Sequence, residues 1–162
     1  MSNEARNFTT PVGRLVGGSV SEPITKDFDG KPLTNKSDGK PTQRYNFSVA
    51  FAKRPGETHW SQSELGKIVW EVGHAHMGPL AQRPDFSWKV TDGDSNVPNK
   101  RNNKPCENEG WPGHWVFHFS SSFPPSTYNA DGSQPVPAES IKRGYFVQVA
   151  GTVSGNDNQT NP

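Results

Sequence analysis

Histidine and cysteine are the residue types in this chain that could hold a metal ion or act as a nucleophile. His74 and His76 lie on either side of an alanine, and His114 and His118 lie four residues apart. Neither pair has a carboxylate or cysteine at a spacing that would complete a zinc site. Cys106, the single cysteine, has no obvious histidine partner, and the sequence contains no phosphate-binding loop or nucleophile elbow. We therefore expect a protein that is not an enzyme, with no catalytic residue, metal or cofactor.

A stronger chemical pattern combines aromatic rings with cations in residues 41–53, PTQRYNFSVAFAK. Tyr45, Phe47 and Phe51 occupy alternate positions, so in a β-strand they share one face. Exposed rings can stack on the bases of a nucleic acid, and cations beside them can neutralise its phosphates. The same alternation is typical of a strand that turns an apolar face into a core. The segment therefore predicts either a stacking platform or a core strand.

The residues of this segment can be shared between ligand binding and core packing in two ways, because the core of a small β protein has to be filled by part of each strand. In the first, Tyr45 and Phe47 emerge at a binding groove while Phe51 turns into the core beyond a bulge. In the second, the whole aromatic face is core, and only Arg44 and Lys53 reach the ligand. We predict the first division.

Rings and cations also occur together in other segments. Trp88 precedes Lys89, and Trp111 and Trp115 follow a polar segment that contains several basic residues. Two or three stacked bases would suffice for binding, because each contributes about 1 to 3 kcal/mol. The residues expected to contact a nucleic acid are Arg44, Tyr45, Phe47, Lys53, Trp88, Lys89, Lys100, Arg101, Lys104, Trp111 and Trp115.

The elements that must position these residues are short. Of the 162 residues, 30% are hydrophobic, and the chain contains 16 glycines and 15 prolines. This composition favours a single, mainly β domain with many turns and long loops. We expect one domain over residues 1–162, with a core over 12–155 and flexible ends at 1–11 and 156–162.

Hydrophobic periodicity predicts the individual elements. One amphipathic helix is expected over residues 59–78. Strands are expected over 13–24, 41–53, 85–95, 114–122 and 143–155.

The distribution of charge is more informative than its sum. The formal net charge of +1 does not indicate a nucleic-acid or membrane partner. However, residues 26–54 include seven basic residues and only three acidic ones. The aromatic segment 41–53 therefore lies in the most basic part of the chain.

The order of these elements, two strands joined by a basic loop, a helix, a short strand and two more strands, resembles the five-stranded Greek-key barrel of the OB-fold. The segments GKPTQRYNFSVAFAK, DFSWKVTDGDS, GHWVFHFSSS and IKRGYFVQVAGTVSG are similar to segments of a bacteriophage family of single-stranded DNA-binding proteins, distant relatives of the T7-like replication protein of that class. The similarity covers most of residues 10–155. It implies a mainly β OB-fold barrel with one helix and long loops. It also implies sequence-independent binding of single-stranded DNA in phage replication or recombination.

Proteins of this family normally end in an acidic tail that recruits replication partners. This sequence ends in a polar segment with one charged residue, Asp157, so we expect the tail to be absent here. The N-terminus does not resemble a signal peptide, no apolar run is long enough to span a membrane, and no disulfide framework is present. We therefore expect the protein in the host cytoplasm.

A carbohydrate-binding or virion structural β module is the alternative function, because tryptophan rings also stack on sugar faces. Sugar binding would need neither Lys100, Arg101 nor Lys104, and it would be nearly independent of salt.

Overall fold

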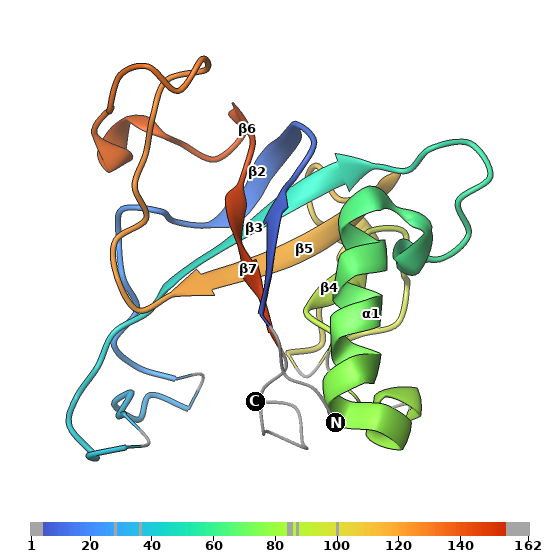
Figure 1. Cartoon of the computed structure of the whole chain (residues 1–162), viewed down its shortest axis with the longest axis horizontal. Coiled ribbons are helices and arrows are strands. Elements are labelled where there is room, and N and C mark those ends of the chain that lie inside the picture. The colour runs from blue at the N-terminus through green and yellow to red at the C-terminus, as the bar shows by residue number, and fades with distance from the viewer. Residues whose placement is uncertain are drawn as a thin grey trace.

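The chain folds into short strands and one α-helix, and the prediction of mainly β structure with one helix is confirmed for the residues described (Figure 1). The computed structural model describes residues 5–27, 29–35, 37–83, 86, 88–99 and 101–154. The strands are β1 (Arg6–Thr9), β2 (Gly13–Gly18), β3 (Tyr45–Ala52), β4 (Val90–Asp92), β5 (His114–Ser121), β6 (Phe146–Val147) and β7 (Ala150–Val153). The helix is α1 (Glu64–Met77), and single 3₁₀ turns occupy Trp60–Gln62, Gly78–Gln82, Pro105–Glu107 and Ala138–Ser140.

The strands form two antiparallel sheets. The large sheet has the order β4-β5-β3-β2-β6, and β1 pairs with β7 in a two-stranded sheet. The chain passes between the sheets at Thr10, which is 1% exposed. Its backbone N–H donates to the Val149 carbonyl at 2.8 Å, and its Oγ1 accepts from the Val149 N–H at 3.0 Å.

The expected closed five-stranded Greek-key OB-fold barrel is not what the structure shows. The two sheets do not close into a barrel, because β4 has three residues and, among the described residues, pairs with β5 alone. The large sheet therefore keeps an open edge at β4.

The core lies on one face of the large sheet, between that sheet and α1. Leu15 of β2, Val49 of β3 and Phe117 of β5 are each at most 3% exposed and form one cluster with Leu65 of α1. Phe8 of β1 packs against this cluster from the small sheet. Figure 1 shows α1, β1 and β7 on the same side of the large sheet. We call this side of the sheet the core face.

The aromatic side chains of residues 45–51 face the core, as in the second of the two predicted divisions, so the prediction that Tyr45 and Phe47 emerge at a groove is corrected. Tyr45 is 7% exposed and Phe51 is 6% exposed. Phe47 packs against the core, with its ring stacked on Phe119 at 5.4 Å between centroids. The physical reason is that β3 pairs with β5 without interruption, while the bulge lies in β2 instead. The face of β3 therefore does not change along its length.

Several elements are shorter than the sequence predicted. β2 ends at Gly18, which has a φ of +70°. A side chain would not fit at this position, because a Cβ there would lie 2.1 Å from the Asn46 carbonyl oxygen. The helix begins at Glu64, since the Ser63 side chain accepts the N–H of Gly66 at 3.1 Å and so caps it. The strand expected over 85–95 is reduced to β4, the one expected over 143–155 is divided into β6 and β7, and β1 was not predicted. Within the described residues, no helix is long and apolar enough to cross a bilayer.

Replacing Leu15 with alanine tests the position of the core. Leu15 is 1% exposed, so the substitution leaves a cavity among well-packed side chains. We expect the free energy of unfolding to fall by about 2 to 5 kcal/mol. Val12→Ala is the control, because Val12 is 64% exposed and this change should cost less than about 0.5 kcal/mol. Urea unfolding followed by tryptophan fluorescence measures both, and equal losses would contradict this core.

Candidate functional site

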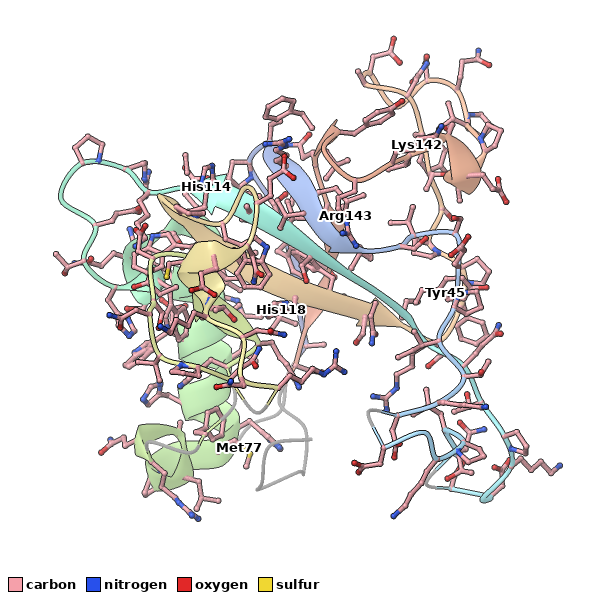
Figure 2. The ribbon with its side chains drawn as sticks, turned by 180° about the vertical axis from the view of Figure 1, so that it is seen from behind. Tyr45, Met77, His114, His118, Lys142 and Arg143 are labelled. Atoms are coloured by element: carbon pink, nitrogen blue, oxygen red, sulfur yellow. The ribbon has the colours of Figure 1, made fainter. Side chains whose placement is uncertain are left out.

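The face of the large sheet opposite the core face is built from small and polar side chains, and we call it the second face. In the strand register, Ser48 lies opposite His118, and Ala50 lies opposite both Val116 and Arg14. Thr91 of β4 lies opposite Val116 and so belongs to the same face. Figure 2 views the molecule from this side and shows His118 on β5. Ala50 and Val116 are almost fully buried on this face, whereas Arg14, Ser48 and Thr91 are partly exposed.

Trp111 lies over the second face. It packs against a small cluster made by Val16, Ala50 and Val116, and its ring lies 6.0 Å from that of His118 between centroids. The side chain is half-buried, so part of the indole remains accessible. Among the tryptophans that the sequence predicted as contacts, Trp111 is the one that the structure places on this face.

His118 is held on the second face by two hydroxyl groups. Its Nδ1 lies 2.7 Å from Ser48 Oγ and its Nε2 lies 2.8 Å from Thr91 Oγ1. Burial, and to a smaller extent the positive charge of Lys89, lowers the pKa of His118 to about 4. The imidazole is therefore neutral at neutral pH and fixed in orientation.

Three cations reach the second face or its margin without an acidic partner. Within the described part of the chain, Arg14, Arg44 and Lys89 take part in none of the ion pairs, which involve Arg6, Lys53 and Arg54. Arg14 Nε donates to the Gly144 carbonyl at 3.3 Å. Partial burial, followed by the neighbouring charge of Arg44, lowers the pKa of Lys89. Two positive charges held near each other favour the binding of an anion between them.

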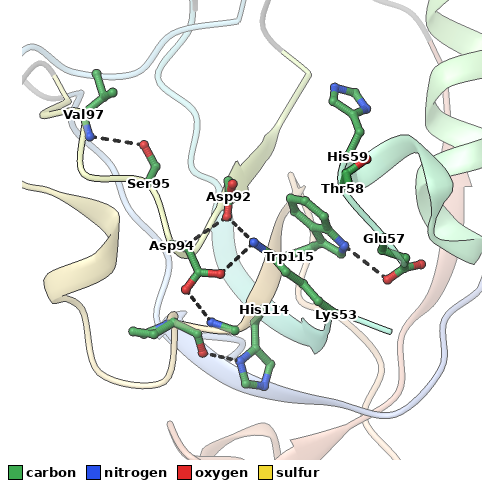
Figure 3. A network of polar contacts seen from close by, with 12 residues as sticks. Lys53, Glu57, Thr58, His59, Asp92, Asp94, Ser95, Val97, His114 and Trp115 are labelled. Atoms are coloured by element: carbon green, nitrogen blue, oxygen red, sulfur yellow. Dashed lines mark hydrogen bonds and ion pairs between the residues drawn. The ribbon is translucent and has the colours of Figure 1, made fainter. Parts of the chain in front are cut away.

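Lys53, which the sequence predicted as a phosphate contact, is already neutralised. Its Nζ lies 2.6 Å from Asp92 Oδ1 and 2.7 Å from Asp94 Oδ2, and it also sits 4.2 Å from the centre of the Trp115 ring (Figure 3). Burial lowers the pKa of Lys53, but the hydrogen bonds and charges of the two carboxylates outweigh it, so the pKa is raised. Glu57 accepts from Trp115 Nε1 at 3.3 Å in the same network. This arrangement joins β3, β4 and β5 and leaves Lys53 poorly suited to a phosphate.

The other predicted stacking residues lie on the core side of the sheet. Trp115 is 2% exposed and Tyr45 is 7% exposed, so neither offers a ring face to a base in this conformation. Trp88 packs beside α1, where its ring stacks on Trp70 at 5.2 Å and on His74 at 5.4 Å between centroids. The fold therefore uses these rings for packing.

The remaining predicted contacts lie in the loop between β4 and β5. Arg101 and Lys104 are exposed there, and the backbone N–H of Arg101 donates to Asn99 Oδ1 at 2.9 Å. Lys100 lies outside the described residues. A role of these three in binding stays a prediction.

Sequence reasoning missed Arg14, His118 and Phe146 as site residues. Phe146 lies opposite Arg14 in the register, on the second face, and is 75% exposed. The signal available in the sequence was the set of residues that alternate with the apolar ones in β3 and β5. In this set, small residues of β3 lie opposite histidines of β5. No group of three or more metal-binding side chains occurs in the part of the chain that the structure describes.

The pH dependence of stability tests the buried, neutral state of His118. The unfolded chain protonates His118 below its ordinary pKa of 6.5, whereas the folded chain does so only near pH 4. The contribution of neutral His118 is therefore complete above pH 6.5 and is lost as the pH falls towards 4. His118→Gln cannot take up a proton, so the stability of the wild type relative to this variant should fall by up to about 3 kcal/mol in this window.

Urea unfolding of both proteins at a series of pH values measures this difference. Stability curves that stay parallel from neutral pH to pH 4 would contradict the buried position of His118.

Comparison with known proteins identifies similar folds. No family model and no curated protein sequence matches the chain. The single-stranded DNA-binding protein from bacteriophage Enc34, solved in complex with single-stranded DNA, superposes with a TM-score of 0.53 at 18% identity, over 89% of this chain and 72% of that one. A C-terminal truncation of the Enc34 protein gives a TM-score of 0.52 at 20% identity, over 89% and 71% of the two chains. This chain therefore has a fold similar to that of a phage single-stranded DNA-binding protein.

Proposed function

We propose that this chain binds single-stranded DNA without reading its sequence, and that the second face of the large sheet is the binding surface. The binding involves no chemical conversion of the DNA. The observation that carries the proposal is that Arg44 and Lys89, which have no carboxylate partner among the described residues, lie near each other, and that Lys89 lies near His118, whose ring is 6.0 Å from the half-buried ring of Trp111 between centroids. The likeness in fold to the Enc34 protein supports it.

The chemistry of the second face suits a single strand. Every nucleotide has a phosphate and a flat base, so cations next to an accessible ring bind any sequence. Arg44 is anchored through its backbone, which exchanges hydrogen bonds of 2.7 and 3.0 Å with Ile24. Its backbone is therefore fixed at the margin of the sheet, and its exposed guanidinium can form paired hydrogen bonds with a phosphate.

His118 and Ser48 lie on the second face beneath the proposed position of the DNA strand. The imidazole makes both of its hydrogen bonds within the protein, and because burial lowers its pKa to about 4, it adds no charge of its own at neutral pH. The small side chain of Ser48 leaves room for the sugar-phosphate backbone to approach the sheet. Affinity then comes from the cations and Trp111, and neither of them distinguishes one base from another.

The proposed site is narrower than the set that the sequence predicted. Of that set it keeps Arg44, Lys89 and Trp111, with Arg101 and Lys104 as further candidates on the adjoining loop. We also propose that binding serves phage replication or recombination in the host cytoplasm, together with replication proteins. The resemblance of the sequence segments to the phage family supports this role.

Titration of the intrinsic tryptophan fluorescence with oligo(dT) at two salt concentrations tests the function. We expect quenching, because Trp111 would stack on a base, and an affinity that decreases as salt increases. An absence of quenching, or binding that is indifferent to salt, would contradict the proposal. Salt-independent binding of an oligosaccharide would instead favour the carbohydrate-binding alternative.

Arg44→Gln tests the cationic part of the site. Each phosphate contact to single-stranded DNA contributes about 0.7 to the slope of log affinity against log salt, so the variant should lose about that much. Lys67→Gln is the control, because Lys67 is an exposed cation on α1, away from the second face. Fluorescence anisotropy of a labelled oligo(dT) gives both slopes. Equal slopes for the two variants would sink the assignment of Arg44.

A further inference from the structure

Residues 142–146, Lys-Arg-Gly-Tyr-Phe, form a turn that runs beside β2, and we call it the 142–146 turn. The Gly144 N–H donates to the Leu15 carbonyl at 2.7 Å, and the Leu15 N–H donates to the Tyr145 carbonyl at 2.9 Å. Arg14 Nε adds a third bond, to the Gly144 carbonyl. Gly144 has a φ of +97°, which a residue with a side chain adopts only with strain. The turn is therefore fixed to the large sheet.

The side chains of the 142–146 turn are unusually exposed for their type. Phe146 is 75% exposed and Tyr145 is 51% exposed, although burial of such rings normally stabilises a fold. Arg143 is also exposed, and it takes part in no ion pair within the described residues. Figure 2 shows Arg143 beside β2, on the side from which the second face is seen. Adjacent exposed rings and an uncompensated cation are the combination that single-stranded nucleic acid requires.

The turn lies at the opposite edge of the sheet from the site proposed above. Lys89 precedes β4 at one edge, and Phe146 begins β6 at the other. The four strand spacings between them amount to about 19 Å. The surface between these two edges carries small side chains where Gly17 lies beside Ser48. A Cβ on Gly17 would meet only Ser48, at 3.6 Å. No large side chain of β2 or β3 therefore blocks the path at the level of Gly17 and Ser48, and the large side chain of β2 that lies next to Phe146 is the cation Arg14.

We infer that the 142–146 turn is a second contact for the same DNA strand, with Phe146 stacked on a base and Arg143 on a phosphate. The strand then crosses β5, β3 and β2 instead of following any one of them. This inference rests on the proposed function and extends it to the far edge of the sheet. A stacked strand advances roughly 3.4 Å per nucleotide, so about six nucleotides cover the path and two cannot reach both ends.

Competition of unlabelled (dT)2 and (dT)8 against a labelled oligo(dT) tests this path. In the wild type, (dT)8 should gain affinity over (dT)2 because it engages both ends. Phe146→Ala should weaken the binding of (dT)8 by about tenfold, the effect of losing one stacked base. Phe146→Leu, which keeps an apolar side chain without a ring, should lose a similar amount, whereas Phe146→Trp should bind as the wild type does.

Arg143→Gln should reduce the salt dependence of (dT)8 binding, with Lys67→Gln as the matched control. Because Phe146 and Arg143 are exposed, none of these variants should change the thermal unfolding midpoint, which serves as the check on folding. Wild-type affinity of Phe146→Ala or Phe146→Leu for (dT)8, with Arg44→Gln still impaired, would overturn the second contact and leave the proposed function intact. Failure of the wild type to bind any oligo(dT) would overturn the proposed function itself.

Discussion

The packing of Leu15, Val49 and Phe117 across three neighbouring strands determines how the other side chains of the large sheet are arranged. Side chains alternate between the two faces of a strand, so burying this row commits every residue of β3 and β5 to a face, whereas the bulge in β2 interrupts the alternation between Leu15 and Gly17. Ser48, Ala50 and His118 are directed to the second face as a consequence. A register slip of one residue would exchange the two faces, removing the core and the candidate site together.

Local charge pairing determines which cations remain available for a ligand. Lys53 and Arg54 are close to carboxylates, and the ion pairs of Lys53 join strands of the large sheet (Figure 3). Arg44 and Lys89 have no such partner within the described residues, and their positive charges repel each other. This repulsion is reduced when an anion binds. The cations that stabilise the fold and those available to bind a phosphate are therefore different residues.

The five tryptophans are divided between the two faces in an uneven way. Trp60, Trp70 and Trp88 contact one another at α1, where Trp70 and Trp88 are stacked and Trp60 meets them edge-on or tilted, and Trp115 is buried under Lys53. Trp111 alone among them packs on the second face. Most of the aromatic content that suggested a stacking surface is thus used to cover one helix and fill the core. The exposed rings Tyr145 and Phe146, at the far edge of the sheet, were not among the predicted contacts.

The mainly β class, the helix and the alternation of residues 45–52 and 114–121 could be predicted from the sequence, because these depend on local periodicity and capping. The sequence also indicated that rings and cations gather around one strand. It could not decide which face of β3 meets the core, since the alternation of Tyr45, Phe47 and Phe51 is the same for a stacking platform and for a core strand. That choice depends on long-range packing: α1, β1 and β7 cover the aromatic face, and Arg14, Trp111 and Phe146 reach the other one only through strand pairing and loop placement.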